Sequence, residues 1–305
     1  MTDLESSLSP EISPEKRSAE VSESAAFRKQ FLFVQGKGGV GKSTLAHAYA
    51  QVLSKKEKTL LVSIEDPLRA PFDLAVLSPT LHHLNNEATS AFEEYAGIKI
   101  GAPRLVKVFL QNRFMRYLAK AAPGIRELVL LGKIWYERKN YARIVIDMPA
   151  TGHGLTMFQS LFNWGALFDG SPLAKDASDM IKTFSDPKEV GHAVISLAEE
   201  MPLVESLELR DHIVRIFPKS DIFFVANRLF PAPTSNAGPF SEALPEARTA
   251  AEHAYRKSRL EKENLAEWKK ISYLRVPFFP PRITHSFSGV VAEVTALLSK
   301  SEGAK

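Results

Sequence analysis

The sequence predicts an α/β fold, in which a mostly parallel β-sheet is flanked by helices within a single domain. Short apolar runs typical of buried strands recur along the chain, with helical segments between them. The clearest runs are Phe31–Val34, Leu60–Ile64, Ile144–Ile146, Ala193–Leu197 and Ile222–Ala226. Because strands joined by helical crossovers pair in parallel, these runs indicate one buried sheet. The chain has 305 residues, of which 45% are hydrophobic, and this is enough for the core of such a domain.

The beginning of the chain differs in composition from the rest. Residues 1–24 contain six acidic and two basic residues, two prolines and many serines, with little apolar surface to bury. Such a composition is typical of disordered or loosely held segments. We therefore expect an acidic tail over residues 1–27 and a folded domain over residues 28–305.

A glycine-rich loop follows the first strand, at Gly36-Lys37-Gly38-Gly39-Val40-Gly41-Lys42-Ser43-Thr44, and a helical segment begins at Leu45. This order is the setting of the G-x-x-x-x-G-K-[ST] pattern, in which backbone N–H groups and the helix N-terminus bind phosphate. We expect Lys42 to contact the β- and γ-phosphates of a nucleotide and the Ser43 hydroxyl to bind Mg²⁺. A glycine-rich turn that binds no nucleotide is the alternative. The expected phosphate-binding residues are Gly38, Gly39, Val40, Gly41, Lys42, Ser43 and Thr44.

Asp147 directly follows the strand Ile144–Ile146, about 100 residues after the loop. An acid at this position suits the residue that holds the water shell of Mg²⁺, so Asp147 is the second candidate metal ligand. Capping of the next helix is an equally ordinary role for an aspartate at a strand end. The residues alone leave both roles open.

Two motifs are similar to those of a known ATPase family. K-G-G-V-G-K-S-T, residues 37–44, resembles the deviant phosphate loop shared by MinD, ParA, the nitrogenase iron protein and the arsenite-pump ATPases. D-M-P-A-T-G-H, residues 147–153, resembles the second switch of the ArsA-like ATPases, which include the arsenite-pump and tail-anchored-protein-targeting ATPases. The resemblance runs in order from Phe31 to about Leu298 and includes E-E-M-P-L-V-E at residues 199–205.

Several roles follow from this resemblance. Lys37 would cross a dimer interface to the partner's nucleotide, and the chain would be an ATP-binding, Mg²⁺-dependent ATPase that forms a homodimer. Asn227 matches the family's adenine-recognising asparagine, and its amide can pair with the adenine edge. A turn role is the alternative for Asn227. Pro277 and Phe278 match the family's base-flanking loop.

The first switch is expected in Ser63-Ile64-Glu65-Asp66-Pro67, which looks like the family's S-T-D-P with one extra residue. The family's aspartate orients the attacking water, so either Glu65 or Asp66 would take that role. We favour Asp66 because it keeps the Asp-Pro step, whose proline holds the preceding residue in extended geometry. The following residues, 68–70, depart from the family pattern, and this departure concerns the rate of hydrolysis rather than nucleotide binding.

The resemblance implies an ATPase whose nucleotide state switches a partner- or client-binding surface. The alternatives are a nucleotide-sensing binding protein and a MinD/ParA-like positioning factor with little turnover. Residues 104–143 contain ten Lys or Arg against two Glu, which indicates either a solvated helix face or a landing surface for an acidic partner or membrane headgroups. Residues 155–168 are uncharged and rich in Met and aromatic residues, which suits either the core or a surface for apolar clients.

The chain contains no cysteine. This excludes disulfides, zinc–thiolate and iron–sulfur sites, and the cysteine-based arsenite site of the pump ATPases. The sequence shows neither an apolar run long enough for a membrane span nor a signal peptide, so we expect a cytoplasmic protein. The second-switch motif differs from that of the DNA-partitioning relatives, and we expect no nucleic-acid partner.

Overall fold

The computed structural model describes residues 23–68, 70, 74–91, 94, 124–167, 172–230, 245–268, 271–279 and 286–303. Its strands form one eight-stranded sheet in the order β3-β4-β2-β5-β1-β6-β7-β8, in which only β3 and β4 pair antiparallel. The predicted mostly parallel α/β fold is therefore confirmed. The strands are β1 (Phe31–Gln35), β2 (Thr59–Ile64), β3 (Leu74–Ser78), β4 (Leu81–Asn86), β5 (Arg143–Asp147), β6 (Val190–Leu197), β7 (Asp221–Leu229) and β8 (Tyr273–Pro277).

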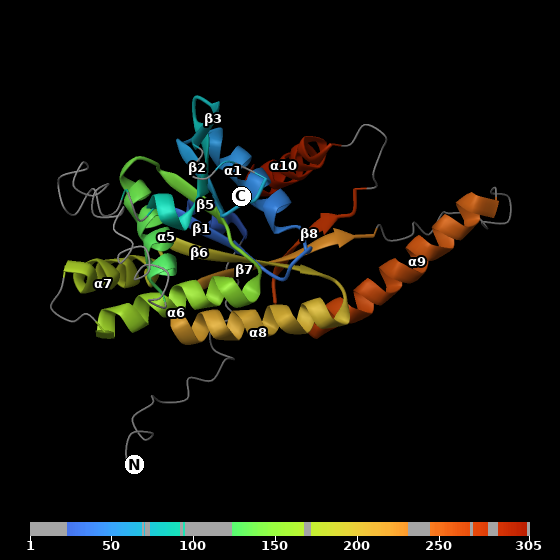
Figure 1. Cartoon of the computed structure of the whole chain (residues 1–305). Coiled ribbons are helices and arrows are strands. Elements are labelled where there is room, and N and C mark those ends of the chain that lie inside the picture. Colours follow the sequence, from blue (N-terminus) through green and yellow to red (C-terminus); the bar gives the residue numbers. More distant parts are fainter. Residues whose placement is uncertain are drawn as a thin grey trace, which may run out of the picture.

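Helices cover both faces of the sheet (Figure 1). One face is covered by α1 (Lys42–Ser54), α10 (Phe287–Gly303) and the 3₁₀ turn η2 (Glu23–Arg28). The opposite face is covered by α5 (Ile125–Tyr136), α6 (Thr151–Leu167), α7 (Pro172–Phe184) and α8 (Glu200–Ile216). The short turn η3 (Glu137–Lys139) follows α5, and η5 (Ala266–Trp268) follows α9 (Pro245–Leu265). Helix α9 touches the body at its C-terminal end and extends away from it at the other (Figure 1).

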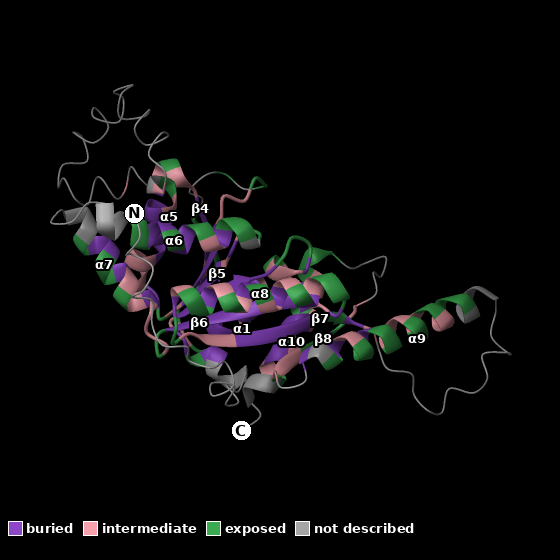
Figure 2. Ribbon diagram, turned by 90° about the horizontal axis from the view of Figure 1, so that it is seen from below, coloured by how far each residue is buried: buried purple, intermediate pink, exposed green. Residues whose placement is uncertain are grey.

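The central strands are apolar throughout because both of their faces are covered. In β1, Phe31 and Phe33 pack beneath α5, α6 and α7, whereas Leu32 and Val34 pack beneath α1 and α10. Successive side chains of a strand point to opposite faces, so a strand between two helix layers needs apolar residues at every position. Figure 2 shows the resulting band of buried residues between the helix layers.

His192 on β6 is a fully buried exception to this apolar pattern. Its ring stacks between those of Phe33 and Phe217, and its Nδ1 lies 2.7 Å from Nε2 of Gln35. Burial lowers the pKa of His192 to about 3. The ring is therefore neutral at physiological pH and acts as part of the core.

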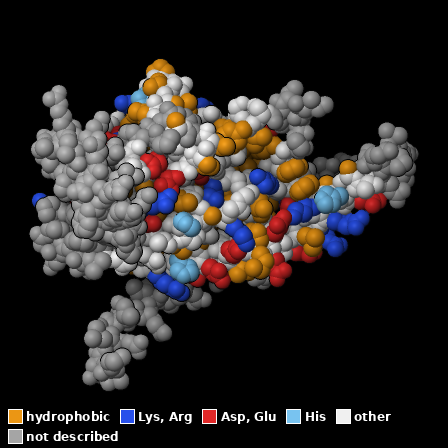
Figure 3. Space-filling model, viewed as in Figure 1, with side chains coloured by type: hydrophobic (Ala, Val, Ile, Leu, Met, Phe, Trp, Pro, Cys, Tyr) orange, Lys and Arg blue, Asp and Glu red, His pale blue; other side chains and the backbone are white. Residues whose placement is uncertain are grey.

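The five predicted strands are all present, but β3, β4 and β8 were not predicted. Strand β4 has the sequence Leu81-His82-His83-Leu84-Asn85-Asn86, and three of its polar side chains, those of His83, Asn85 and Asn86, are buried. Strand β3 lies at the edge of the sheet and exposes Leu74, Val76 and Leu77. Hydrophobic side chains gather at this projecting hairpin in Figure 3.

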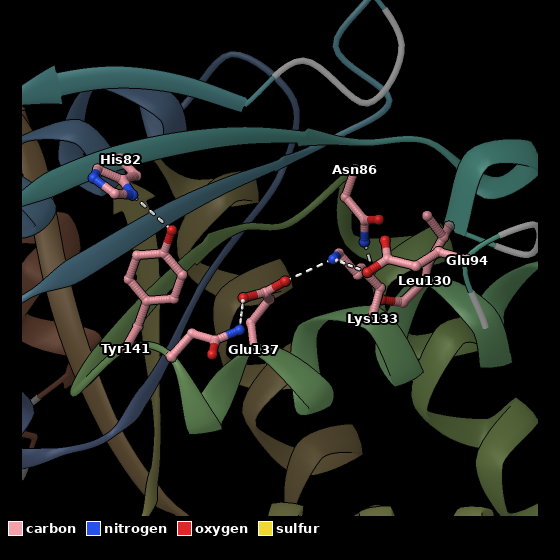
Figure 4. A network of polar contacts seen from close by, with 8 residues as sticks. His82, Asn86, Glu94, Leu130, Lys133, Glu137 and Tyr141 are labelled. Atoms are coloured by element: carbon pink, nitrogen blue, oxygen red, sulfur yellow. Dashed lines mark hydrogen bonds and ion pairs between the residues drawn. The ribbon is translucent and has the colours of Figure 1, made fainter. Parts of the chain in front are cut away.

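Charged and polar side chains join β4 to α5 and η3 (Figure 4). Asn86 donates from Nδ2 to the carbonyl oxygen of Leu130 over 3.0 Å. The almost fully buried Lys133 lies between Glu94 and Glu137, with N–O distances of 2.7 and 2.6 Å. A buried ammonium group needs paired carboxylates, so this arrangement compensates the charge of Lys133 and leaves it no role as a free surface cation.

The basic segment predicted over residues 104–143 is described only from residue 124 onward; residues 104–123 lie outside the described part of the chain. Beyond Lys133, two of its arginines are also ion-paired: Arg126 with Glu65 and Arg143 with Glu57. The described portion therefore does not present a continuous unpaired basic face.

The predicted acidic tail lies mostly outside the described residues, which begin at residue 23. Ala26 and Phe27 are buried against α1 and α10, and the ring of Phe27 packs 5.5 Å from that of Tyr49. The packed unit therefore includes residues just before position 28. The tail itself stays a prediction.

Candidate functional site

The glycine-rich loop joins the end of β1 to the start of α1, as predicted. Three of its glycines have positive φ angles: 147° at Gly36, 82° at Gly39 and 97° at Gly41. A Cβ atom at Gly36 would collide with the carbonyl oxygen of Ile195, and one at Gly41 would collide with the side-chain amide of Asn227. Gly36 and Gly41 are therefore required both by backbone conformation and by the space available, and Gly39 by backbone conformation alone.

Asn227 lies beneath this loop, at the end of β7 where it pairs with β6. It is buried, donates from Nδ2 to the carbonyl oxygen of Val40 over 2.8 Å, and accepts at Oδ1 from the N–H of Arg228 over 2.9 Å. The structure thus brings Asn227 to the phosphate loop, but both ends of its amide already bind protein groups. Its predicted contact with adenine stays a prediction.

Lys42, the first residue of α1, points back over the loop. Its Nζ donates to the carbonyl oxygen of Lys37 over 3.0 Å. Burial lowers the pKa of Lys42, and the nearby Asp147 carboxylate opposes that shift. A partly desolvated ammonium beside turned backbone is a suitable partner for phosphate, because an incoming anion would compensate its lost hydration.

Asp147 ends β5, next to Val34 of β1 and Ser63 of β2 in the strand register. Burial raises the pKa of Asp147, while a hydrogen bond from Ser43 and the charge of Lys42 act in the opposite direction. Its Oδ1 is buried and has no hydrogen-bond partner among the described residues. The structure therefore brings Lys42, Ser43 and Asp147 together, as the two motifs predict.

The two candidates of the first switch occupy different surroundings. The carboxylate of Glu65 is paired with Arg126 of α5, with the Nε–Oε1 distance at 3.1 Å, and its backbone has φ of 52°. Asp66 is near enough to Asp147 for its negative charge to raise the pKa of Asp147. Asp66 thus lies near the site, with Oδ1 accepting from the N–H of Leu68, whereas the carboxylate of Glu65 is paired with α5.

Strand β4 contributes residues that the motifs did not indicate. Asn85 makes three hydrogen bonds to the backbone of Asp66 and Ala70. His83 lies 2.8 Å from the Ser63 hydroxyl through Nε2, and its ring packs edge-on against His47. No sequence signal marks these residues, because a polar side chain in a short strand is read as exposed until its neighbours are known.

Pro277 and Phe278 lie at the end of β8, beside β7. The N–H of Phe278 donates to the carbonyl oxygen of Leu229 over 2.7 Å, and its ring stacks on Phe230 with centroids 4.8 Å apart. Both predicted residues are therefore at the strand ends near Asn227. Their contact with a base stays a prediction.

Lys37 makes an ion pair within its own chain. Its Nζ binds Oε1 of Glu205, which lies on α8 within the predicted E-E-M-P-L-V-E segment. The other carboxylate oxygen of Glu205, Oε2, is buried and has no hydrogen-bond partner among the described residues. The predicted cross-subunit lysine is thus directed toward its own α8 in this structure.

The second switch is shorter than its sequence pattern suggests. Residues 148–150 form the connection, and α6 already begins at Thr151, so Gly152 and Gly154 lie in a helical turn. The apolar stretch predicted over residues 155–168 is largely core, since Met157, Phe158 and Leu161 are buried. The side chains of Trp164 and Phe168 lie outside the described residues.

The described residues contain neither a metal-binding cluster nor a membrane-spanning helix. They contain no cluster of three or more His, Cys, Asp or Glu side chains arranged to hold a metal ion. None of their helices combines the length and the apolar character that a membrane crossing needs.

Residues 29–170 match the family model described as anion-transporting ATPase. The chain is similar to a putative arsenical pump-driving ATPase of Halobacterium salinarum, with 26% identity over 60% of this chain and 34% of the relative. It is also similar to the ATPase BagA of Mycobacterium tuberculosis, with 26% identity over 65% of each chain. An ATPase ASNA1 homolog of Plasmodium yoelii yoelii is 31% identical over 42% of this chain and 35% of the relative.

The chain thus spans about a third of the halobacterial relative and less than two thirds of the mycobacterial one. The matched segment includes the phosphate loop, both switches and strands β1 to β5, whereas Asn227, Pro277 and Phe278 lie outside it. The predicted resemblance to the ArsA-like ATPases is confirmed, and it rests on residues 29–170.

Proposed function

We propose that this chain binds ATP with Mg²⁺ and hydrolyses it in the cytoplasm, as a homodimer whose nucleotide state controls a partner-binding surface. The observation that carries the proposal is the loop at residues 36–44, with its positive-φ glycines, near Asp147 at the end of β5, whose Oδ1 atom is buried. Such a loop presents N–H groups at a helix N-terminus, where a phosphate is stabilised by hydrogen bonds and by the helix dipole.

The residues present fit a magnesium ion. Oδ1 of Asp147 is buried without a partner among the described residues, and the adjacent Ser43 supplies a hydroxyl. Carboxylate and hydroxyl oxygens, with water, are the ligands that Mg²⁺ prefers. We assign Ser43 as a direct ligand and Asp147 as an acceptor for metal-bound water. When bound, the metal would neutralise charge on the phosphates.

The remaining roles follow from the surroundings of each side chain. Lys42 would leave the Lys37 carbonyl oxygen for the phosphates, since charge neutralisation is stronger than a hydrogen bond to a neutral carbonyl. Asp66 would orient the attacking water, because the competing Glu65 is paired with Arg126. Asn227 would contact adenine, with Pro277 and Phe278 beside the base, once its amide gives up the Val40 carbonyl.

In the homodimer, Lys37 would act on the partner's nucleotide. Lys37 must leave Glu205 to take this role, so dimer formation would be linked to breaking the ion pair between the phosphate loop and α8. The same helix exposes Met201, one turn before Glu205, and Val204, directly before it. We therefore assign the partner-binding surface to α8 rather than to the apolar stretch of α6, which is mostly core.

The test is ATP binding and phosphate release by the purified chain, compared with Lys42→Ala. We expect magnesium-dependent release by the wild type and loss of both binding and release in the variant. Binding without release would favour the nucleotide-sensing alternative. Unchanged ATP affinity in Lys42→Ala would refute the phosphate site itself.

A mixing experiment tests the homodimer. Neither Lys37→Ala nor Asp66→Asn alone should retain full turnover, but mixed dimers contain one composite site with both residues intact. Recovered activity in the mixture is expected, because Lys37 and Asp66 would come from different chains at one nucleotide. Absence of recovery, together with a monomeric mass in ATP and Mg²⁺, would contradict the cross-subunit role.

A further inference from the structure

Asn85 of β4 is hydrogen-bonded to the backbone of the first switch on both sides of Asp66. Its Oδ1 accepts from the N–H of Asp66 over 2.9 Å. Its Nδ2 donates to the carbonyl oxygens of Asp66 and Ala70 over 3.1 and 3.0 Å. The side chain is buried, with 2% of its surface exposed, so these bonds form away from competing water.

The position of Asn85 follows from the pairing of β2 with β4. Ser63 pairs with Asn85 and Ile64 with Asn86, and the last backbone bond runs from the N–H of Glu65 to the carbonyl oxygen of Asn86 over 3.0 Å. At Glu65 the chain leaves the strand with φ of 52°, a conformation uncommon for residues other than glycine. Among the described residues, the ladder provides no backbone partner for Asp66, which follows.

The Asn85 amide takes the place of that missing partner. A carboxamide presents a carbonyl oxygen and an N–H donor side by side, as a peptide group does. It can therefore bind both the N–H and the carbonyl oxygen of Asp66, and fix the peptide planes on each side of that residue. The carboxylate of Asp66 is oriented further by accepting from the N–H of Leu68 at Oδ1 over 2.9 Å.

We propose that Asn85 is a positioning residue for hydrolysis, which holds Asp66 in the orientation needed to direct water. This inference rests on the proposed function, because it assigns Asp66 to the water. Asn85 itself touches the switch backbone rather than the phosphate loop. Its loss should therefore reduce turnover and leave ATP affinity unchanged.

Two substitutions separate the contributions of the amide. Asn85→Ala removes all three hydrogen bonds. Asn85→Asp keeps an acceptor for the Asp66 N–H but loses both donors, and places a carboxylate against two carbonyl oxygens. Asn86→Ala is the matched control, because Asn86 is a buried asparagine on the same strand that donates to Leu130 of α5 and not to the switch.

The experiment measures amide hydrogen exchange at Asp66 together with the steady-state kinetics of the full chain. In Asn85→Ala, we expect the Asp66 amide to exchange at least about tenfold faster, because its acceptor is gone. We also expect kcat to fall at least about tenfold with ATP affinity within about twofold of wild type. Asn85→Asp should retain more of the protection at Asp66 than Asn85→Ala does. Asn86→Ala should lower the melting temperature without either effect.

Each other result overturns the inference at a defined step. Unchanged exchange at Asp66 in Asn85→Ala would show that the side chain does not hold the switch. Faster exchange with kcat within about twofold of wild type would show that the hold is irrelevant to turnover. If Asn86→Ala lost as much kcat and as much amide protection at Asp66, Asn85 would contribute only to general stability. Failure of the proposed function is recognised separately, by an absence of phosphate release from the wild type.

Discussion

Replacing Glu205 with glutamine should make the chain a more active dimer. In the structure, Lys37 is paired with Glu205 of its own α8, and this contact competes with any reach across to a partner's nucleotide. Glu205→Gln keeps the size of the side chain and removes its charge. Lys37 would then be available to the partner without first breaking an ion pair.

The magnitude follows from how exposed the pair is. The side chains of Lys37 and Glu205 are 49% and 27% exposed, so solvent screens much of their attraction. Ion pairs of this kind contribute about 0.2–1 kcal/mol, and the upper end corresponds to roughly a fivefold change in an equilibrium constant. Each chain of the homodimer breaks one such pair, so we expect the protein concentration that gives half-maximal specific activity to fall by up to about 25-fold.

The assay is phosphate release across a range of protein concentrations, with sedimentation velocity in ATP and Mg²⁺ to count dimers. Glu208→Gln is the matched control, because it removes the same charge from an exposed position of the same helix. An unchanged or rightward-shifted curve for Glu205→Gln would refute the competition. A shift of equal size in Glu208→Gln would attribute the effect to the net charge of α8.

Three further outcomes are expected. Asp66→Asn should keep ATP affinity and lose at least about tenfold in phosphate release, about 1.4 kcal/mol of barrier, and a larger loss in Glu65→Gln would transfer the water-orienting role to Glu65. Asn227→Ala should reduce the preference for ATP over GTP in calorimetric titrations; equal weakening of both would restrict Asn227 to supporting the loop. His192 has a folded pKa of about 3, below its ordinary value of about 6.5, so only the unfolded state gains a proton between these pH values, and stability falls as pH falls. Between pH 7 and pH 5, the free energy of unfolding measured by chemical denaturation should fall by about 2 kcal/mol more in wild type than in His192→Gln. Equal decreases in the two proteins would contradict the low pKa of His192.

The sequence predicts those parts of the fold in which the apolar pattern of a segment matches its burial in the folded chain. Strands β1, β2 and β5 are mostly apolar because both of their faces are covered, and the phosphate loop is marked by glycines that its φ angles require. The order of these elements was enough to place Lys42, Ser43 and Asp147 together.

Strand β4 shows why the rest could not be predicted. Its buried His83, Asn85 and Asn86 break the apolar pattern, and each of them makes at least one hydrogen bond to another part of the chain. Those partners are up to 44 residues away in the sequence. The ion pair between Lys37 and Glu205 spans 168 residues, and nothing in either motif indicates it.

The exposed edge of the sheet affects how this protein must be handled. Strand β3 exposes Leu74, Val76 and Leu77, its outer edge pairs with no other strand among the described residues, and Val76 is 68% exposed. Edges of this kind pair with one another between molecules, which produces aggregates that do not depend on nucleotide. Light scattering at high concentration would count such aggregates as dimers. A lysine at position 76 would oppose edge-to-edge pairing through charge repulsion, and Val76→Lys is therefore a useful background for every concentration-dependent measurement.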